Sequence, residues 1–153
     1  MHEHTRERLA RLLAERPDDP TLQKIARVLA RETGADNRDL NSVRGIAYLV
    51  QNYEAEVYNG GHMQFFLNST GEYAEPTLEA LLLLGAIEHA GVLAEALALV
   101  RDNPLPEEHG SEIYRTSPLA GPLHAIDRAY WQVKPELATL LQAYYEQHRE
   151  SFI

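Results

Sequence analysis

The segment at residues 59–71 is the feature that most constrains how this chain can fold. It reads Asn-Gly-Gly-His-Met-Gln-Phe-Phe-Leu-Asn-Ser-Thr-Gly and follows a long amphipathic run. Asn and Gly readily adopt the left-handed conformation that closes a helix, so residues 59–61 predict a helix C-terminus. The next residues are too apolar for a solvated loop, and residues 68–71 are a second turn signal. We therefore expect a short buried helical turn, held by glycines and side-chain amides at both ends.

Helical periodicity extends along most of the remaining chain. Helices are predicted at 5–16 and 20–34, from Asn41 or Ser42 to Asn59, at 76–84 and 87–100, and in two segments of the last third. Gly85 is expected to separate two of them, which would pack as a central antiparallel hairpin. No strand signal is present. The prediction is an all-α, single compact domain of about seven helices.

Within this domain, residues 1–40 form a predicted N-terminal helical hairpin and residues 41–153 form the main helical unit. Residues 102–121 are rich in Pro and Gly and predict a loop of about twenty residues, a length that is usually functional or mobile. Leu84→Ala is expected to lower stability by about 2–5 kcal/mol, as for a buried leucine. The predicted core residues are Ile46, Phe65, Phe66, Leu81, Leu84 and Leu97.

The charge of the chain is acidic and unevenly distributed. The net charge is −9, yet residues 45–100 contain seven Glu and no Lys or Arg. This balance disfavours direct binding to nucleic acid or to an anionic membrane. The chain has no Cys and no stretch of about 20 apolar residues, and its N-terminus does not resemble a signal peptide. A cytoplasmic protein without membrane contact is expected.

The motif at 59–71, followed by Ala-Leu-x-x-Leu-Gly-Ala from Ala80, resembles the bacterial DNA-mimic protein family, which consists largely of domains of unknown function. The similarity covers about residues 54–100. It implies an all-helical fold and binding to proteins, with DNA mimicry known for particular members. The chain departs from the pattern at His62, where the family usually has an aromatic residue. The motif residues expected to form a structural junction are Asn59, Gly60, Gly61, Gln64, Phe65, Phe66, Asn68 and Gly71.

Catalytic and metal-binding patterns are absent from the sequence. There is no His-Glu-x-x-His or paired Glu-x-x-His, no Gly-x-Ser-x-Gly elbow and no phosphate-binding loop. His124 and Asp127 share a helix face, but a metal site there is disfavoured. We expect no catalytic residues, no metal and no cofactor, and hence no enzyme. The alternative is a small-molecule-binding or enzymatic domain, whose amide-lined pocket at 59–68 would include Asn52.

The acidic side chains instead favour an interaction surface. Glu75 and Glu79 are four residues apart, and Glu88 and Glu95 seven apart, so each pair is expected to share an exposed helix face. Carboxylates can stand in for phosphates and attract the Arg and Lys of a basic partner, such as a DNA-binding regulator. An immunity-type protein that neutralises a basic toxin or nuclease is the alternative, and a homodimer is left open. The predicted partner-binding residues are Glu72, Glu75, Glu79, Glu88 and Glu95.

Overall fold

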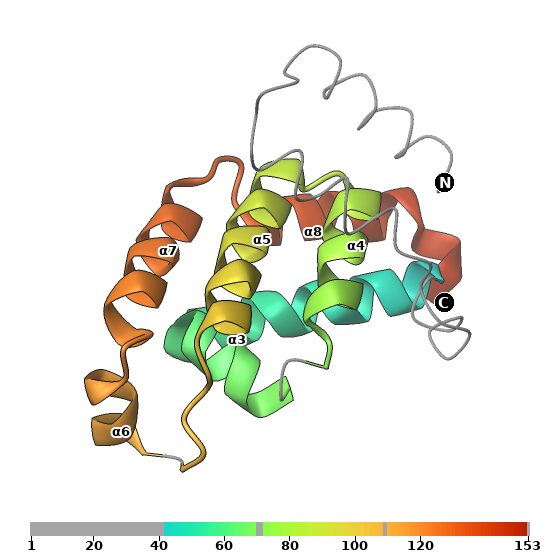
Figure 1. Cartoon of the computed structure of the whole chain (residues 1–153). Helices are drawn as coiled ribbons and strands as arrows, with labels where there is room; N and C mark the ends of the chain where they lie inside the picture. The colour runs from blue at the N-terminus through green and yellow to red at the C-terminus, as the bar shows by residue number, and fades with distance from the viewer. Residues whose placement is uncertain (1–41, 70–71, 109, 153) are drawn as a thin grey trace.

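The computed structural model describes residues 42–69, 72–108 and 110–152 (Figure 1). The predicted N-terminal hairpin at 1–40 and the motif residue Gly71 lie outside the described residues. The described part contains no strand, so the all-α prediction is confirmed. Its elements are α3 (Val43–Ser69), α4 (Ala74–Leu84), α5 (Ile87–Asp102), α6 (Ser111–Thr116), α7 (Ala120–Gln132), α8 (Leu137–Gln147) and the 3₁₀ helix η2 (Arg149–Phe152).

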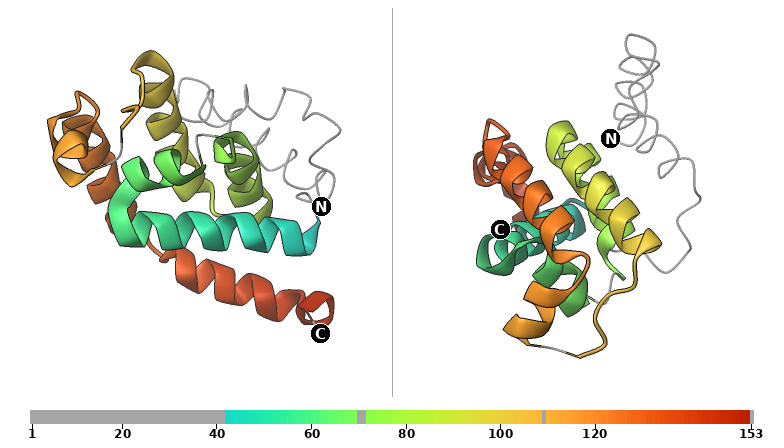
Figure 2. Two further views of the ribbon diagram at one scale, coloured as in Figure 1. Left: turned by 90° about the horizontal axis from the view of Figure 1, so that it is seen from below. Right: turned by 60° about the vertical axis from the view of Figure 1, so that its left-hand side comes forward.

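Helix α3 is the element on which the others pack. It contacts α4, α7 and α8, and Figure 2 (left) shows its first half running between α8 and the pair α4–α5. The Ser42 hydroxyl caps this helix by accepting the Gly45 backbone N–H at 3.0 Å, as Ser does at helix N-termini. None of the described helices is both long and apolar enough to span a membrane.

The predicted hairpin of α4 and α5 is present, and Gly85 separates the two helices. Gly85 has φ 97° and ψ 7°, the left-handed conformation. Its N–H and that of Ala86 bond back to carbonyls in the last turn of α4, with Ala86 N at 2.8 Å from Leu81 O. This arrangement satisfies carbonyls that the helix end would otherwise leave unpaired. Because only two residues join the helices, α5 folds back along α4 (Figure 1).

One predicted boundary is wrong. The expected loop at 102–121 contains α6, and α7 begins within it at Ala120. Helix α6 has six residues, too few to produce a recognisable hydrophobic period. The long loop is therefore two short connections.

The predicted core is correct apart from Leu84. Ile46, Phe65, Phe66 and Leu81 are at most 1 % exposed and Leu97 is 7 % exposed. Leu84 is only partly buried and packs against the edge of the core, because it ends α4 next to the turn at Gly85. The expected loss for Leu84→Ala was therefore too large.

We predict that Leu81→Ala lowers the free energy of unfolding by about 2–5 kcal/mol, since it removes a fully buried side chain and leaves a cavity. Leu84→Ala, the matched change one helical turn away, should lower it by less than half as much. Urea unfolding followed by circular dichroism measures both. Equal losses would contradict the burial described for these two residues.

Candidate functional site

The junction inside α3 is built on two glycines. Gly60 (φ −157°, ψ 17°) and Gly61 (φ 73°, ψ −172°) are not helical, and they divide α3 into two helical segments. The Gly61 conformation lies in a region essentially reserved for glycine. A Cβ atom on Gly61 would also lie 2.4 Å from Asp127 Oδ2. The predicted helix end at Asn59 is thus correct, and the chain restarts as a helix at His62.

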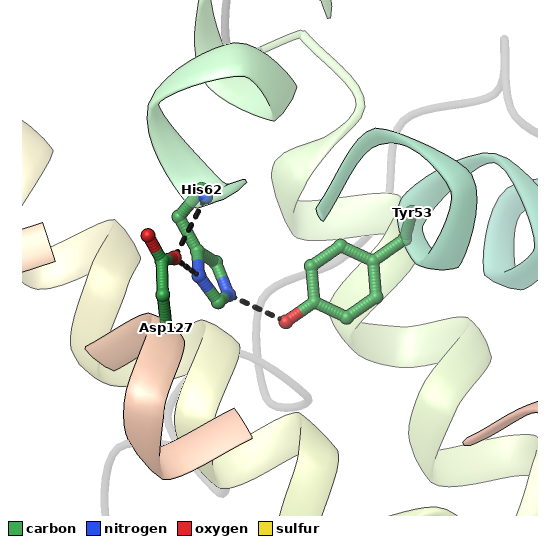
Figure 3. Close-up of polar contacts among 3 residues, drawn as sticks. All are labelled: Tyr53, His62 and Asp127. Atoms are coloured by element: carbon green, nitrogen blue, oxygen red, sulfur yellow. Dashed lines mark hydrogen bonds and ion pairs between the residues drawn. The ribbon is translucent and has the colours of Figure 1, made fainter. Parts of the chain in front are cut away.

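His62 links the two segments of α3 to α7 (Figure 3). Its Nε2 lies 2.7 Å from the Tyr53 hydroxyl in the first segment. Its Nδ1 lies 2.6 Å from Asp127 Oδ1 on α7. Asp127 Oδ1 also accepts the His62 backbone N–H at 2.9 Å, one of the donors freed by the break in the helix. One carboxylate oxygen therefore holds both the ring and the backbone of His62.

The hydrogen-bond directions follow from the chemistry of the three groups. An ionised carboxylate only accepts, so His62 Nδ1 must donate to Asp127. In a neutral imidazole Nε2 then accepts, and the Tyr53 hydroxyl donates to it. Burial, followed by the charges of Tyr130 and Asp127, raises the pKa of Tyr53 well above its ordinary value. The hydroxyl therefore keeps its proton and remains a donor.

Glu56 makes a second link across the junction. Its Oε2 accepts Gln64 Nε2 at 2.8 Å and Asn68 Nδ2 at 2.9 Å. Glu56 lies before the glycines and the two amides lie after them, so one carboxylate joins the segments. This use of the amides favours the structural interpretation of the motif over a pocket lined by Gln64 and Asn68. Asn59 is exposed at the end of the first segment.

The Tyr53–His62–Asp127 chain has the connectivity of a proton relay, but its position favours structure over chemistry. Tyr53 and His62 are 0 % exposed, so no substrate can reach either end of that pair. The His62 ring lies in an aromatic cluster, with centroids 5.6 Å from Tyr53 and 6.0 Å from Tyr130. The imidazole thus fills the place of an aromatic side chain and adds hydrogen bonds to it. Asp127 bonds to His62 rather than to its helix neighbour His124. No group of three metal ligands occurs among the described residues.

The five predicted partner-binding glutamates do not form one exposed surface. Glu72, Glu88 and Glu95 are exposed. Glu75 is half-buried and forms an ion pair with Arg101 of α5. Glu79 is only 9 % exposed, so the expectation that Glu75 and Glu79 share an exposed face is wrong. The reason is that α4 packs against both α3 and α5, which leaves it little free surface.

Helix α5 carries an acidic stripe that we define as Glu88, Glu95 and Asp102. All three are exposed and follow one another at intervals of seven residues, which is close to two helical turns. They therefore lie on one side of α5 at intervals of about 10 Å. The sequence prediction did not include Asp102, because it rested on the segment without Lys or Arg at 45–100, which ends before Asp102. Since Arg101 bonds to Glu75, its charge is already engaged.

A small cavity with both polar and apolar lining residues lies at the start of α5. Its volume is about 30 Å³, and its lining includes Glu54 of α3, His89 of α5, Tyr130 and Trp131 of α7, and Glu136 just before α8. Burial lowers the pKa of His89 to about 4, so its ring is neutral at neutral pH. Burial also raises the pKa of Tyr130, and the negative charges of Glu54 and Glu136 raise it further. The lining of the cavity thus combines the neutral side chains of His89 and Tyr130 with two acidic residues, Glu54 and Glu136.

A family model, the DMP19-like protein, matches residues 38–148. The chain belongs to the DMP19-like protein family. No curated protein and no solved structure matches the chain significantly. The match extends beyond the motif at 59–71 and includes both Asp127 and the acidic stripe, so the junction and the stripe are parts of one family domain.

For this DMP19-like protein we predict that Gly61→Ala lowers the free energy of unfolding by about 2 kcal/mol or more. The added methyl group would occupy a strained conformation and displace the Asp127 carboxylate. Gly121→Ala is the control, since a Cβ atom there meets nothing within 4 Å. Thermal unfolding should show a large loss for the first variant and no loss for the second.

We also predict that the Tyr53–His62 contact is coupled. His62→Phe keeps an aromatic ring but removes the partner of the buried Tyr53 hydroxyl, which should lower stability by about 1–3 kcal/mol. Adding Tyr53→Phe removes the unsatisfied hydroxyl, so the double variant should lose less than the sum of the two single losses. Urea unfolding of the four proteins gives the coupling free energy. Simple additivity would show that the hydrogen bond contributes nothing specific.

Proposed function

We propose that this DMP19-like protein is a non-enzymatic binding protein whose acidic stripe, Glu88, Glu95 and Asp102, occupies the DNA-binding surface of a basic partner. The observation that carries the proposal is the distribution of charge. Residues 42–153 hold 15 Asp or Glu against six Lys or Arg, so the whole net charge of −9 falls on the part that contains the family domain. A DNA-binding regulator presents the complementary charge.

Three cations of the domain form ion pairs with its acids. Arg101 pairs with Glu75, Arg115 with Glu112 and Lys134 with Glu136. Each of these pairs joins a base to an acid that is not in the stripe. These pairs leave the charges of the stripe itself without a cation, and in this proposal the stripe attracts a basic surface over about 8–10 Å at physiological ionic strength.

The spacing of the stripe limits how closely it imitates DNA. Carboxylates about 10 Å apart are much sparser than the charges of duplex DNA, which occur about every 1.7 Å along its axis. Charge alone would therefore accelerate association without giving strong specificity. Exposed aromatic side chains supply the remaining contact area in this proposal. Tyr58 is 70 % exposed and Trp131 is 48 % exposed, and their rings lie 5.9 Å apart in an edge-to-face arrangement.

The same surface suits an immunity-type protein that covers a basic nuclease or toxin. The two functions predict different partners: a regulator that binds DNA in one case, and a toxin or nuclease in the other. The activity of the partner alone therefore distinguishes them. The enzymatic alternative has less support, because Gln64 and Asn68 are used by Glu56. A homodimer would compete with either function only if it covered α5.

The test begins with affinity capture from the source organism and identification of bound proteins by mass spectrometry. The captured partner is then purified and its affinity is measured for the wild type and for a Glu88→Lys, Glu95→Lys variant. We expect a loss of at least about tenfold, because each reversal replaces attraction by repulsion. The partner should also release its DNA as this protein is added, in a mobility-shift assay.

The matched control is Glu146→Lys, Glu150→Lys, which makes the same change of charge at two exposed positions near the C-terminus. It should reduce affinity only slightly. Equal losses in the two variants would show general charge attraction and would contradict the proposal. A partner that binds without releasing DNA would exclude mimicry and favour the immunity-type alternative when that partner is a toxin.

A further inference from the structure

The cavity at the start of α5 has a combination of groups that a purely structural void would not need. Its carboxylates come from separate elements, Glu54 from α3 and Glu136 from the loop before α8. His89 also lines it and is 2 % exposed. No hydrogen bond to the His89 imidazole is found within residues 42–69, 72–108 and 110–152, where its described contact is an edge-to-face one with the Tyr130 ring. A buried imidazole normally has a hydrogen-bond partner, and water or a ligand in the cavity can supply one here.

The size of the cavity and its position restrict that ligand. A volume of about 30 Å³ has room for about two water molecules, or for the head of one side chain entering from outside. It is reached from the surface, since Trp131 is 48 % exposed and the Glu136 side chain is 66 % exposed. His89 and Glu88 are neighbours in the first turn of α5, so the cavity lies at the end of the helix where the acidic stripe begins.

We propose that this cavity binds the guanidinium group of an arginine side chain presented by the basic partner. Two acidic residues and a neutral imidazole, each from a different element, offer acceptors to it. A guanidinium is planar and carries five N–H donors, so it can meet several acceptors at once. Its flat face also stacks on aromatic rings, and Trp131 and Tyr130 supply such walls. An ammonium is compact and strongly hydrated, and would use these walls less well.

The ion pair between Lys134 and Glu136 does not block this assignment. Lys134 Nζ lies 2.7 Å from Glu136 Oε1, and both side chains are 66 % exposed. Pairs of this kind are weak and exchange readily with solvent. Glu54 lines the cavity independently of Lys134, and it comes from the helix on which the fold is built. An arriving arginine therefore competes for only one of the two carboxylates.

The inference deepens the proposed function, because it names one contact that a basic partner would make, but its test needs no partner. The full chain is titrated with N-acetyl-arginine-N-methylamide, and with the citrulline and lysine analogues. The chain has one Trp, so the indole N–H signal in a ¹⁵N–¹H spectrum reports Trp131 alone. We expect a saturable shift with the arginine probe, a weaker response to the lysine probe and no saturable shift with the uncharged citrulline probe.

Three variants test whether the cavity is responsible. Glu54→Gln and Glu136→Gln should each weaken binding of the arginine probe, the former by about tenfold because its carboxylate is the less exposed. Glu95→Gln makes the same change in the acidic stripe, two turns along α5, and should leave the probe affinity unchanged. Circular dichroism confirms folding of each variant, and Glu136→Gln keeps the test available if Glu54→Gln does not fold.

Equal shifts with the arginine and citrulline probes would overturn the inference, as would equal weakening by Glu54→Gln and Glu95→Gln. An equal response to arginine and lysine would overturn the assignment to a guanidinium. These outcomes are independent of the capture experiment. If the cavity does not bind arginine, a partner whose affinity depends on Glu88 and Glu95 still supports the proposed function. If no such partner is found, arginine binding by the cavity is still established by the titration.

Discussion

The fold depends on the break in α3, a helix that stops at Gly60 and Gly61 and restarts while both of its segments pack into the core. Both segments of α3 contribute fully buried side chains, Tyr53 and Val50 before the glycines and Phe65 and Phe66 after them. Breaking the helix frees backbone donors, among them the N–H of the buried His62, and leaving a buried donor unpaired costs about 1–3 kcal/mol. Asp127 resolves this by accepting the His62 backbone N–H from a different helix. The carboxylate that satisfies the break also fixes α7 against α3.

This arrangement explains why acidic residues have two separate roles in one domain. Glu56 and Asp127 point into the junction and accept hydrogen bonds from Gln64, Asn68 and His62. Glu88, Glu95 and Asp102 are exposed on α5, where no packing requirement determines their identity. A charge count for the whole chain mixes these two groups. Burial and hydrogen bonding separate them, and only the second group is available to a partner.

Sequence patterns predicted the helices because helical stops and periods are local properties. The glycines at 60–61, the turn at Gly85 and the cap at Ser42 each act within a few residues, and each is found in the structure. The roles of Glu56 and Asp127 were missed for the opposite reason. Asp127 lies 65 residues from His62 along the chain, and no local pattern indicates which helix will meet the junction. The burial of Glu79 was missed likewise, because spacing within α4 does not reveal how many neighbours cover it.

The Tyr130 side chain packs against the junction in α3 and also lines the cavity at the start of α5. The Tyr130 ring lies 5.8 Å from Tyr53 and 6.0 Å from His62, both at the junction, and 5.6 Å from His89 in the cavity. Tyr130 is 5 % exposed, and close-packed interiors do not let a ring of that size move without moving its neighbours. The wall of the cavity is therefore positioned by the same contacts that hold the break in α3. A change of backbone conformation at Gly60 or Gly61 would therefore shift the Tyr130 ring and, with it, the surroundings of His89. No residue of the 59–71 motif itself lines the cavity. In the proposed function the motif would therefore act by placing α7, and the residues proposed to meet a partner lie outside it.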